Sequence, residues 1–397
     1  MKRREFVAGA GILAGVGLVG VRALSVSDQP VPDVDVDSGD QTAVVAGRRI
    51  DVHHQILPPM FIDALQREGI DQIAGLSLAE WSVQQSLDLL ETQGVQTAIT
   101  SLAAPGVYFG DAMASARLAR QCNEFSAKMM ADNPGRFGSF AAIPLPATEQ
   151  ACAEAIYALD TLHADGVSLL GSNDGVFLGD PRFEELMAEL DRRHATVFLQ
   201  PNVHASSQKL DLGTPAFSLE TVCDTTRAAV NLIFTGTLER YPRINWILAN
   251  GGGFLPYAAW RISLANALPE FNDLVPQGVL SYLRRFYFDT ALAASAGPMA
   301  VLRELVEPTQ VLFGSGFPLA SAELVASQVA MLDSSSIWTP RQRLGIQRKH
   351  ALRLFPRYED KGERVTPAVV HESESTGQWL GRMAKKPIGA IAQKLKE

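Results

Sequence analysis

Several polar side chains that could do chemistry stand at the ends of short apolar runs of the sequence. The first is His53, whose imidazole can take up or release a proton near neutral pH. Others are carboxamides, which carry a hydrogen-bond donor and an acceptor together. The set predicts a polar site in which His53 is the candidate acid or base. The candidate ligand-binding residues are Gln55, Gln200, His204, Asn250 and Asp289.

These residues can act together only if the fold brings the ends of their strands to one place. Amphipathic helices are predicted between apolar runs, as at residues 112–132, 147–162, 181–193 and 218–240. This alternation predicts a parallel sheet, and eight units within residues 48–357 favour an α/β fold, a single-domain (β/α)8 TIM-type barrel. The eight predicted strands are residues 50–53, 95–101, 137–143, 166–170, 196–200, 244–250, 286–290 and 310–315.

A doubly wound sheet is the alternative to the barrel. Neither a GxGxxG nor a GxxxxGK[ST] motif follows any predicted strand, so the sequence gives no support to nucleotide binding. The chain of 397 residues is 47% hydrophobic and 20% charged, which is enough to bury a large core. Its net charge of −8 argues against nucleic acid as a partner.

The first 25 residues are predicted to be an export signal. Paired arginines, Arg3 and Arg4, precede an uncharged, glycine-rich run over residues 6–21, and the pattern resembles a twin-arginine signal. The run is shorter than the roughly 20 residues that span a bilayer. We therefore expect a periplasmic or secreted protein, which would contact a membrane only if the signal stays uncleaved.

The rest of the chain divides by composition. Residues 26–47 are rich in aspartate and are predicted to form an acidic linker. The barrel is expected over residues 48–357. Residues 358–397 are predicted to be a polar tail that ends in a basic segment.

The strand ends resemble the amidohydrolase-related family of the aminocarboxymuconate-semialdehyde-decarboxylase type. The resemblance covers essentially all of residues 48–357. It implies a metal-dependent barrel that hydrolyses or decarboxylates small, often aromatic, carboxylates. The segments that carry it are Asp51-Val52-His53-His54-Gln55, Phe198-Leu199-Gln200-Pro201, Ile247-Leu248-Ala249-Asn250-Gly251-Gly252 and Phe313-Gly314-Ser315-Gly316-Phe317-Pro318.

Four of the five functional positions that the resemblance implies are changed in this chain. His53 matches the first histidine of the family's strand-one motif. The second histidine is Gln55, and the family's histidines on strands five and six are Gln200 and Asn250. The family's strand-eight aspartate is Gly316.

A divalent metal such as zinc, which the family would use, is typically held by three imidazole or carboxylate ligands. Carboxamides are poor zinc ligands and glycine offers none. The sequence therefore predicts that the metal site is lost and that no cofactor is bound.

Three interpretations follow. The first is an exported pseudoenzyme that binds a small aromatic carboxylate or a catalytic paralogue, or that forms a homo-oligomer. The second is a metal-free lyase or hydrolase that uses His53. The third is a conventional metal-dependent hydrolase or decarboxylase with displaced ligands. The substitutions at the site favour the first over a transfer of function from the fold.

Overall fold

The computed structural model describes residues 48–78, 80–204, 206–207 and 213–360, together with Glu363, Ala368 and His371. The predicted signal at residues 1–25, the predicted linker at 26–47 and most of the predicted tail lie outside these described residues.

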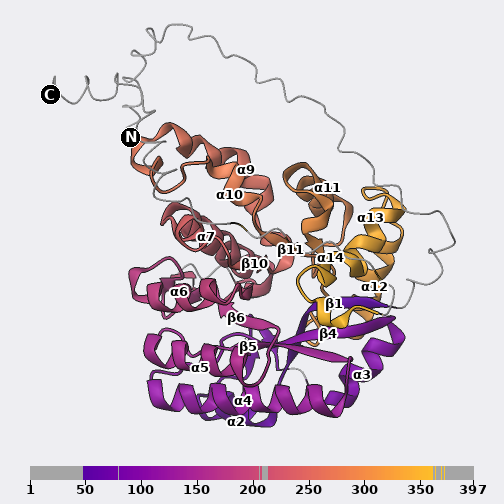
Figure 1. Ribbon diagram of the computed structural model, residues 1–397. Coiled ribbons are helices and arrows are strands. Elements are labelled where there is room, and N and C mark those ends of the chain that lie inside the picture. The colour runs from indigo at the N-terminus through magenta and orange to yellow at the C-terminus, as the bar shows by residue number, and fades with distance from the viewer. Residues whose placement is uncertain are drawn as a thin grey trace, which may run out of the picture. The chain divides into compact units, whose positions relative to one another are not determined.

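Eight parallel strands form one sheet in which each strand pairs with the next along the chain (Figure 1). The strands are β1 (Arg49–Ile56), β4 (Val95–Leu102), β5 (Phe137–Ala142), β6 (Gly166–Leu170), β9 (Thr196–Gln200), β10 (Asn245–Leu248), β11 (Tyr287–Asp289) and β12 (Val311–Leu312). Backbone hydrogen bonds join the first and last strands: Val52 N–H donates to Phe313 O at 2.9 Å, and Gly316 N–H donates to His53 O at 2.8 Å. The sheet is thus a nearly closed barrel, as predicted.

Helices connect the strands and cover the outside of the barrel (Figure 1). They are α2 (Pro59–Arg67), α3 (Val83–Thr92), α4 (Ala112–Asp132), α5 (Thr148–Asp160), α6 (Glu184–Arg192), α7 (Glu220–Phe234), α8 (Thr237–Arg240), α9 (Leu255–Ser263), α10 (Val279–Leu283), α11 (Ala296–Leu305), α12 (Ala322–Asp333), α13 (Pro340–Leu344) and α14 (His350–Leu352). Two small hairpins stand outside the barrel sheet. They are β2 (Gln72–Ile73) with β3 (Leu76–Ser77), and β7 (Ser172–Asn173) with β8 (Val176–Phe177).

The helix predicted at residues 218–240 is interrupted in the structure. Gly236 adopts φ +73°, a left-handed conformation that ends α7 and starts α8. Within the described residues, no helix is both long enough and apolar enough to cross a membrane.

The barrel interior is packed with aromatic rings below the strand ends. Phe140 stacks on Phe198 with their ring centroids 5.3 Å apart, and Phe355 meets Phe140 at 5.8 Å. The edge of Phe198 lies 4.9 Å from the His53 ring. This column packs the barrel interior up to His53, and the active sites of such barrels lie at the carboxyl ends of the strands.

Arg348, which is 0% exposed, fastens the end of the barrel to its beginning. Its guanidinium donates to carboxylate oxygens of Asp360 at 2.8 Å and Glu363 at 2.7 Å. It also donates to Arg48 O at 3.1 Å and to Gln96 Oε1 at 3.0 Å. Each of these bonds is charge-assisted, and together they compensate the burial of the cation.

Candidate active site

A cavity of about 470 Å³ lies at the strand ends, within the about 300–1,000 Å³ typical of ligand sites. Among the described residues that line it, His53 is the only one with a readily titratable side chain. The polar lining residues are His53, Gln55, Gln72, Asn202, Thr221 and Asn250. The larger apolar ones are Ile70, Ile73, Leu76, Val203, Phe217, Leu292 and Leu319. The cavity therefore suits a small, largely apolar ligand.

His53 is held by a buried carboxylate. Its Nδ1 lies 2.7 Å from Asp289 Oδ2, and the two side chains are 6% and 0% exposed. The other oxygen of Asp289 accepts hydrogen bonds from the backbone N–H groups of Asn250 at 2.8 Å and Ala291 at 3.1 Å. Because a carboxylate only accepts, Nδ1 carries the proton of this bond. His53 lines the cavity, and no hydrogen bond from a described residue occupies its Nε2.

The neighbouring His54 points the other way, into the protein. Its Nδ1 lies 3.2 Å from Asp51 Oδ2 and its Nε2 lies 2.8 Å from Ser86 Oγ on α3. The side chains of His54 and Asp51 are 0% exposed. Despite a hydrogen-bond order like that of a hydrolytic triad, no substrate can reach Ser86, which is also 0% exposed.

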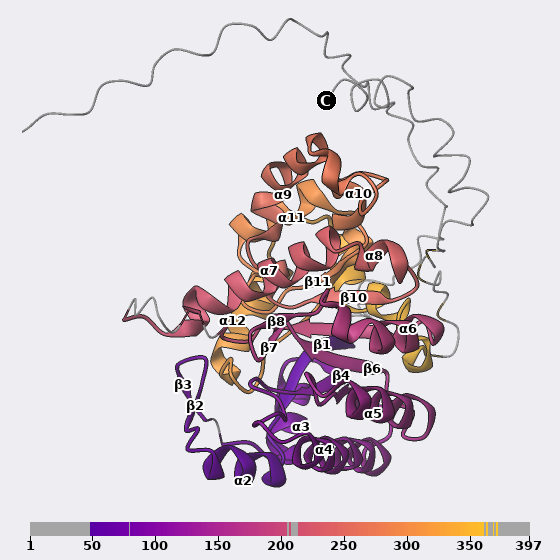
Figure 2. The ribbon, with the colours of Figure 1, turned by 90° about the vertical axis from the view of Figure 1, so that its left-hand side faces the viewer.

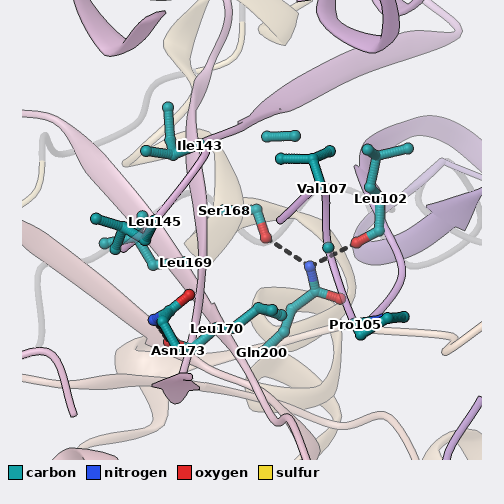
Figure 3. Close-up of a pocket in the computed structure, with 12 residues that line it drawn as sticks. Leu102, Pro105, Val107, Ile143, Leu145, Ser168, Leu169, Leu170, Asn173 and Gln200 are labelled. Carbon is teal, nitrogen blue, oxygen red and sulfur yellow. Dashed lines mark hydrogen bonds between the residues drawn. The ribbon is translucent and has the colours of Figure 1, made fainter. Parts of the chain in front are cut away.

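Gln55 and Gln200 bind each other across the strand ends. Gln55 Nε2 donates to Gln200 Oε1 at 2.9 Å. Gln200 Nε2 in turn donates to Leu102 O at 2.8 Å and Ser168 Oγ at 2.5 Å (Figure 3). Figure 3 shows the Gln200 amide nitrogen directed at these two oxygens, from β4 and β6. Gln200, which stands at the position of the family's strand-five histidine, is thus hydrogen-bonded to the barrel wall.

Asn250 and Gly316 both have left-handed backbones, at φ +57° and +77°. The Asn250 side chain donates from Nδ2 to Ala291 O at 3.2 Å. A Cβ at Gly316 would have no atom closer than 3.5 Å, so a side chain has room there. The cost of a side chain at this position is instead the positive φ.

Backbone strain gathers around this cavity. Six described residues other than glycine have a positive φ, and three of them, Ala74, Asn250 and Leu292, line it. Strained conformations persist where the surrounding structure enforces them, and they cluster at functional sites. The distribution of strain therefore marks the same place as the strand ends.

The hairpin β2–β3 covers one side of the cavity. Figure 2 shows it projecting from the barrel beside α2. Ala74 O at its tip accepts a hydrogen bond from Phe217 N–H at 2.9 Å. Gly75 allows the close approach, because a Cβ there would lie 3.0 Å from the Cα of Pro215. This contact brings Leu76 and Phe217 to the cavity from segments far apart in the sequence.

Three of the six predicted site residues line the cavity, and Gln200 does not, because it lies in the barrel wall beneath Gln55. His53, Gln55 and Asn250 line the cavity, and Asp289 lies behind His53. His204 is not among the lining residues: its ring stacks on Phe177 with centroids 5.3 Å apart, and its Nε2 lies 3.2 Å from Gly175 O.

Apart from Asn202, which follows the strand predicted at residues 196–200, the other lining residues had no recognisable signal in the sequence. Thr221 and Phe217 precede or begin α7, and Leu76 belongs to a strand of two residues. Asn202 is positioned by Asp224, whose Oδ2 accepts its N–H at 2.8 Å. Burial raises the pKa of the Asp224 carboxyl above its ordinary value. Only the glycine at position 75 hints at the turn that builds this side of the cavity.

Known proteins resemble this chain over almost the whole barrel. The profile of the Amidohydrolase family matches residues 50–357. Decarboxylase yanB of Aspergillus niger is 36% identical, over 78% of this chain and 88% of its own. The 6-methylsalicylic acid decarboxylase of Penicillium expansum is 34% identical, over 78% and 96%. Among solved structures, an amidohydrolase II is 27% identical with a TM-score of 0.73, covering 78% of this chain and 99% of its own.

These relatives contradict the interpretation as a pseudoenzyme. Proteins that are 36% and 34% identical over most of their length carry the name decarboxylase. The expectation equated lost metal ligands with lost chemistry. The pair of His53 and Asp289, which can move a proton, is nevertheless present in the structure.

The expectation that no cofactor is bound is contradicted as well. A dihydroxybenzoic acid decarboxylase from Polaromonas sp. JS666 was crystallised with bound manganese. It is 20% identical to this chain with a TM-score of 0.69, over 79% of this chain and 98% of its own. The expectation rested on the loss of imidazole and carboxylate ligands at four positions, whereas manganese also accepts other oxygen donors.

The donor atoms of this chain nevertheless do not fit such an ion. In the part of the chain that the structure describes, no three His, Cys, Asp or Glu side chains are grouped to hold a metal. The imidazole of His53 and the carboxylate of Asp289 bind each other, and Gln200 is tied to the barrel wall. Gly316 has no side chain to offer.

Proposed function

The chain belongs to the amidohydrolase family, and from this membership we propose that it is a decarboxylase that releases CO2 from a small aromatic carboxylic acid. The support comes from relatives of that name that it matches over 88% and 96% of their own length. A small molecule is the partner that the cavity of about 470 Å³ accommodates. Binding of a second copy or of a catalytic paralogue stays a prediction.

The observation that carries the proposal is the orientation of His53. Asp289 accepts the proton of Nδ1 at 2.7 Å and fixes the orientation of the ring, which leaves Nε2 for a ligand in the cavity. Decarboxylation of an aromatic acid requires a proton at the ring carbon that bears the carboxylate. We assign that proton transfer to His53 Nε2.

One bond forms and one breaks at the ring carbon that bears the carboxylate. The Nε2 proton forms a new C–H bond at the ring carbon, and the bond between this carbon and the carboxylate then breaks. Its electron pair returns to the ring, CO2 leaves, and His53 is left neutral until solvent protonates it again. The sum is an aryl carboxylate and a proton converted to an arene and CO2.

The wall of the cavity favours the conversion of the carboxylate to CO2. Apart from His53, no described lining residue bears a readily ionised side chain, so the carboxylate gains no cationic partner from Lys or Arg. A charged group in such surroundings is costly, whereas CO2 is neutral. Because the donor atoms do not fit a metal ion, no step is assigned to one.

The proposal is tested by incubating the purified protein with 6-methylsalicylic acid and with 2,6-dihydroxybenzoate, with and without added manganese. We expect CO2 and the corresponding phenol as products by gas analysis and chromatography. The variant His53→Asn should lose about 10²–10⁴-fold in kcat, the usual contribution of a positioned proton donor.

His194→Asn is a matched control, since His194 is exposed and its φ of +52° is one that asparagine tolerates. Absence of product from both acids under both conditions would refute the proposal. Full activity of His53→Asn would remove His53 from the mechanism.

A further inference from the structure

Gln55 holds a buried acceptor atom that has no partner among the described residues. The residue is 6% exposed and lines the cavity, and its Oε1 makes no hydrogen bond within the described chain. Most buried side-chain polar atoms in folded proteins do have a partner. An orphaned acceptor at the wall of a ligand cavity therefore points to a donor on the ligand.

The orientation of this acceptor is set by a backbone carbonyl. Leu102 O can only accept, so the Gln200 atom 2.8 Å from it must be Nε2. Gln200 Oε1 therefore faces Gln55. Because an amide oxygen only accepts, the Gln55 atom that lies 2.9 Å from it must be Nε2. Rotating either amide by half a turn would set two donors or two acceptors against each other. Gln55 Oε1 is thus the amide oxygen of this pair that has no partner among the described residues.

We propose that Gln55 Oε1 accepts a hydrogen bond from a hydroxyl group of the substrate, so that Gln55 selects hydroxylated aromatic acids. Gln200 is the positioning residue that holds Gln55 in this orientation. The proposal deepens the proposed decarboxylase function and rests on it for the identity of the ligand as an aromatic acid.

The spacing of Gln55 and His53 limits where the hydroxyl lies. The two residues are two positions apart on β1, which places them roughly 7 Å apart along an extended strand. That distance is about the width of one aromatic ring with its substituents. The hydroxyl is therefore on the same ring as the carbon that His53 protonates. An acceptor such as Oε1 would repel the carboxylate itself, so a hydroxyl is the group that it binds.

The experiment compares 2-hydroxybenzoate, 2-methoxybenzoate and benzoate as ligands of the full-length protein by titration calorimetry. The methoxy compound keeps the oxygen but cannot donate. We expect the hydroxy acid to bind at least about tenfold more tightly than the other two, because a site built for a hydroxyl is left with an unpaired polar atom by an analogue that lacks it.

Two variants locate the effect. Gln55→Met keeps the length of the side chain and removes the acceptor. The ratio of the dissociation constant of 2-methoxybenzoate to that of 2-hydroxybenzoate should therefore fall to within about twofold of one. Gln200→Met leaves Oε1 in place but frees its orientation, so the ratio should fall while the hydroxy acid still binds. Gln347→Met is the control: this glutamine is also buried, but it bonds to Asp333 at 2.5 Å.

The outcomes separate this inference from the proposed function. Equal binding of the hydroxy and methoxy acids by the unmodified protein, or an unchanged ratio in Gln55→Met, overturns the inference even if CO2 is released. That first comparison needs no variant, so it stands if Gln55→Met fails to fold. A clear hydroxyl preference without CO2 from any acid supports the role of Gln55 and overturns the decarboxylase proposal.

Discussion

His53 and Asp289 are 236 residues apart in the chain, and their side chains meet at 2.7 Å between Nδ1 and Oδ2. The pair joins β1 to β11. These two strands are not neighbours in the sheet, because β12 follows β11 and lies between it and β1 where the barrel nearly closes. The short contact therefore depends on the near closure of the barrel, and the following predictions test what it does.

The variant Asp289→Asn should lower kcat about 10–100-fold with little change in KM. The amide oxygen can still accept from Asn250 N–H and Ala291 N–H, so the local backbone is preserved. A neutral amide oxygen is a weaker acceptor than a carboxylate, so the His53 ring is held less firmly, and loss of an orienting partner typically has this size. Steady-state kinetics check the prediction. Asp333→Asn is the control, because Asp333 pairs with Arg49 at 2.8 Å instead. Unchanged kcat in Asp289→Asn would contradict the role of the pair.

Removing Gln200 should destabilise the fold. Gln200→Leu leaves Leu102 O and Gln55 Nε2 without partners, which should lower the free energy of unfolding by about 1–3 kcal/mol. Replacing both glutamines by leucine should cost less than the sum of the single changes, since each variant leaves the other residue unpaired. Urea denaturation measures all three. Additive losses would show that the two amides do not interact.

Installing the family's ligands should tighten manganese binding. The fourfold variant Gln55→His, Gln200→His, Asn250→His and Gly316→Asp should bind Mn²⁺ at least about tenfold more tightly than the unmodified chain. Electron paramagnetic resonance of free Mn²⁺ measures the difference, and tighter binding should also raise Tm with added metal. The threefold variant that retains Gly316 tests the strain at φ +77°, where a side chain costs about 1–2 kcal/mol. No gain in either variant would mean that these side chains do not converge.

The stability of the barrel should fall between pH 7 and pH 5 because of His350. Burial lowers the pKa of this imidazole to about 4 and nearby Arg353 acts in the same direction, against the hydrogen bond to Val311 O. Below its unfolded pKa of about 6.5 the unfolded chain binds the proton and the folded chain does not, so stability is complete above that pH and declines as pH falls.

The expected loss from this group is about 2 kcal/mol between pH 7 and pH 5, at 1.36 kcal/mol per pKa unit. Over the same pH interval, the free energy of unfolding of His350→Gln should fall by about 2 kcal/mol less than that of the unmodified protein, as measured by urea denaturation. Equal pH dependence of the two proteins would show that His350 is not responsible.

Export should depend on the paired arginines. Replacing Arg3 and Arg4 with lysine keeps the charge but should retain the protein in the cytoplasm, because a receptor reads such signals. Cell fractionation with immunoblotting checks the prediction. Replacing Lys2 with arginine is the control. Export of the double lysine variant at the normal level would refute the signal.

The sequence was sufficient for the barrel and for its long elements. The helix predicted at residues 112–132 is α4, Ala112–Asp132, because its amphipathic pattern runs over several turns and Asp111 caps its start by accepting from Ala114 N–H at 2.6 Å. The hairpin β2–β3 was not predicted, because its strands have two residues each and two residues show no periodicity.

The site was predictable only in part. The positions of His53, Gln55 and Asn250 followed from the rule that barrel strands end at the site. The placement of His204 depends on Phe177, which precedes it by a whole helix and strand, and no local pattern shows that contact. The acceptor for Gln200 is a backbone carbonyl, Leu102 O, which every residue type could have supplied.

The seam between the first and last strands also constrains how the chain is made. Val52 N–H meets Phe313 O, and Arg348 needs Asp360 and Glu363 as its partners. While the ribosome is still adding the last quarter of the barrel, β1 has one edge without a neighbour, and such an edge can pair with another chain. The nascent protein therefore carries an open strand edge until Phe313 and Gly316 have been made. A chain ending ahead of Arg348 would keep these backbone partners of β1, but it would lose the guanidinium that bonds to Arg48 O and Gln96, although every side chain at the cavity would have been made.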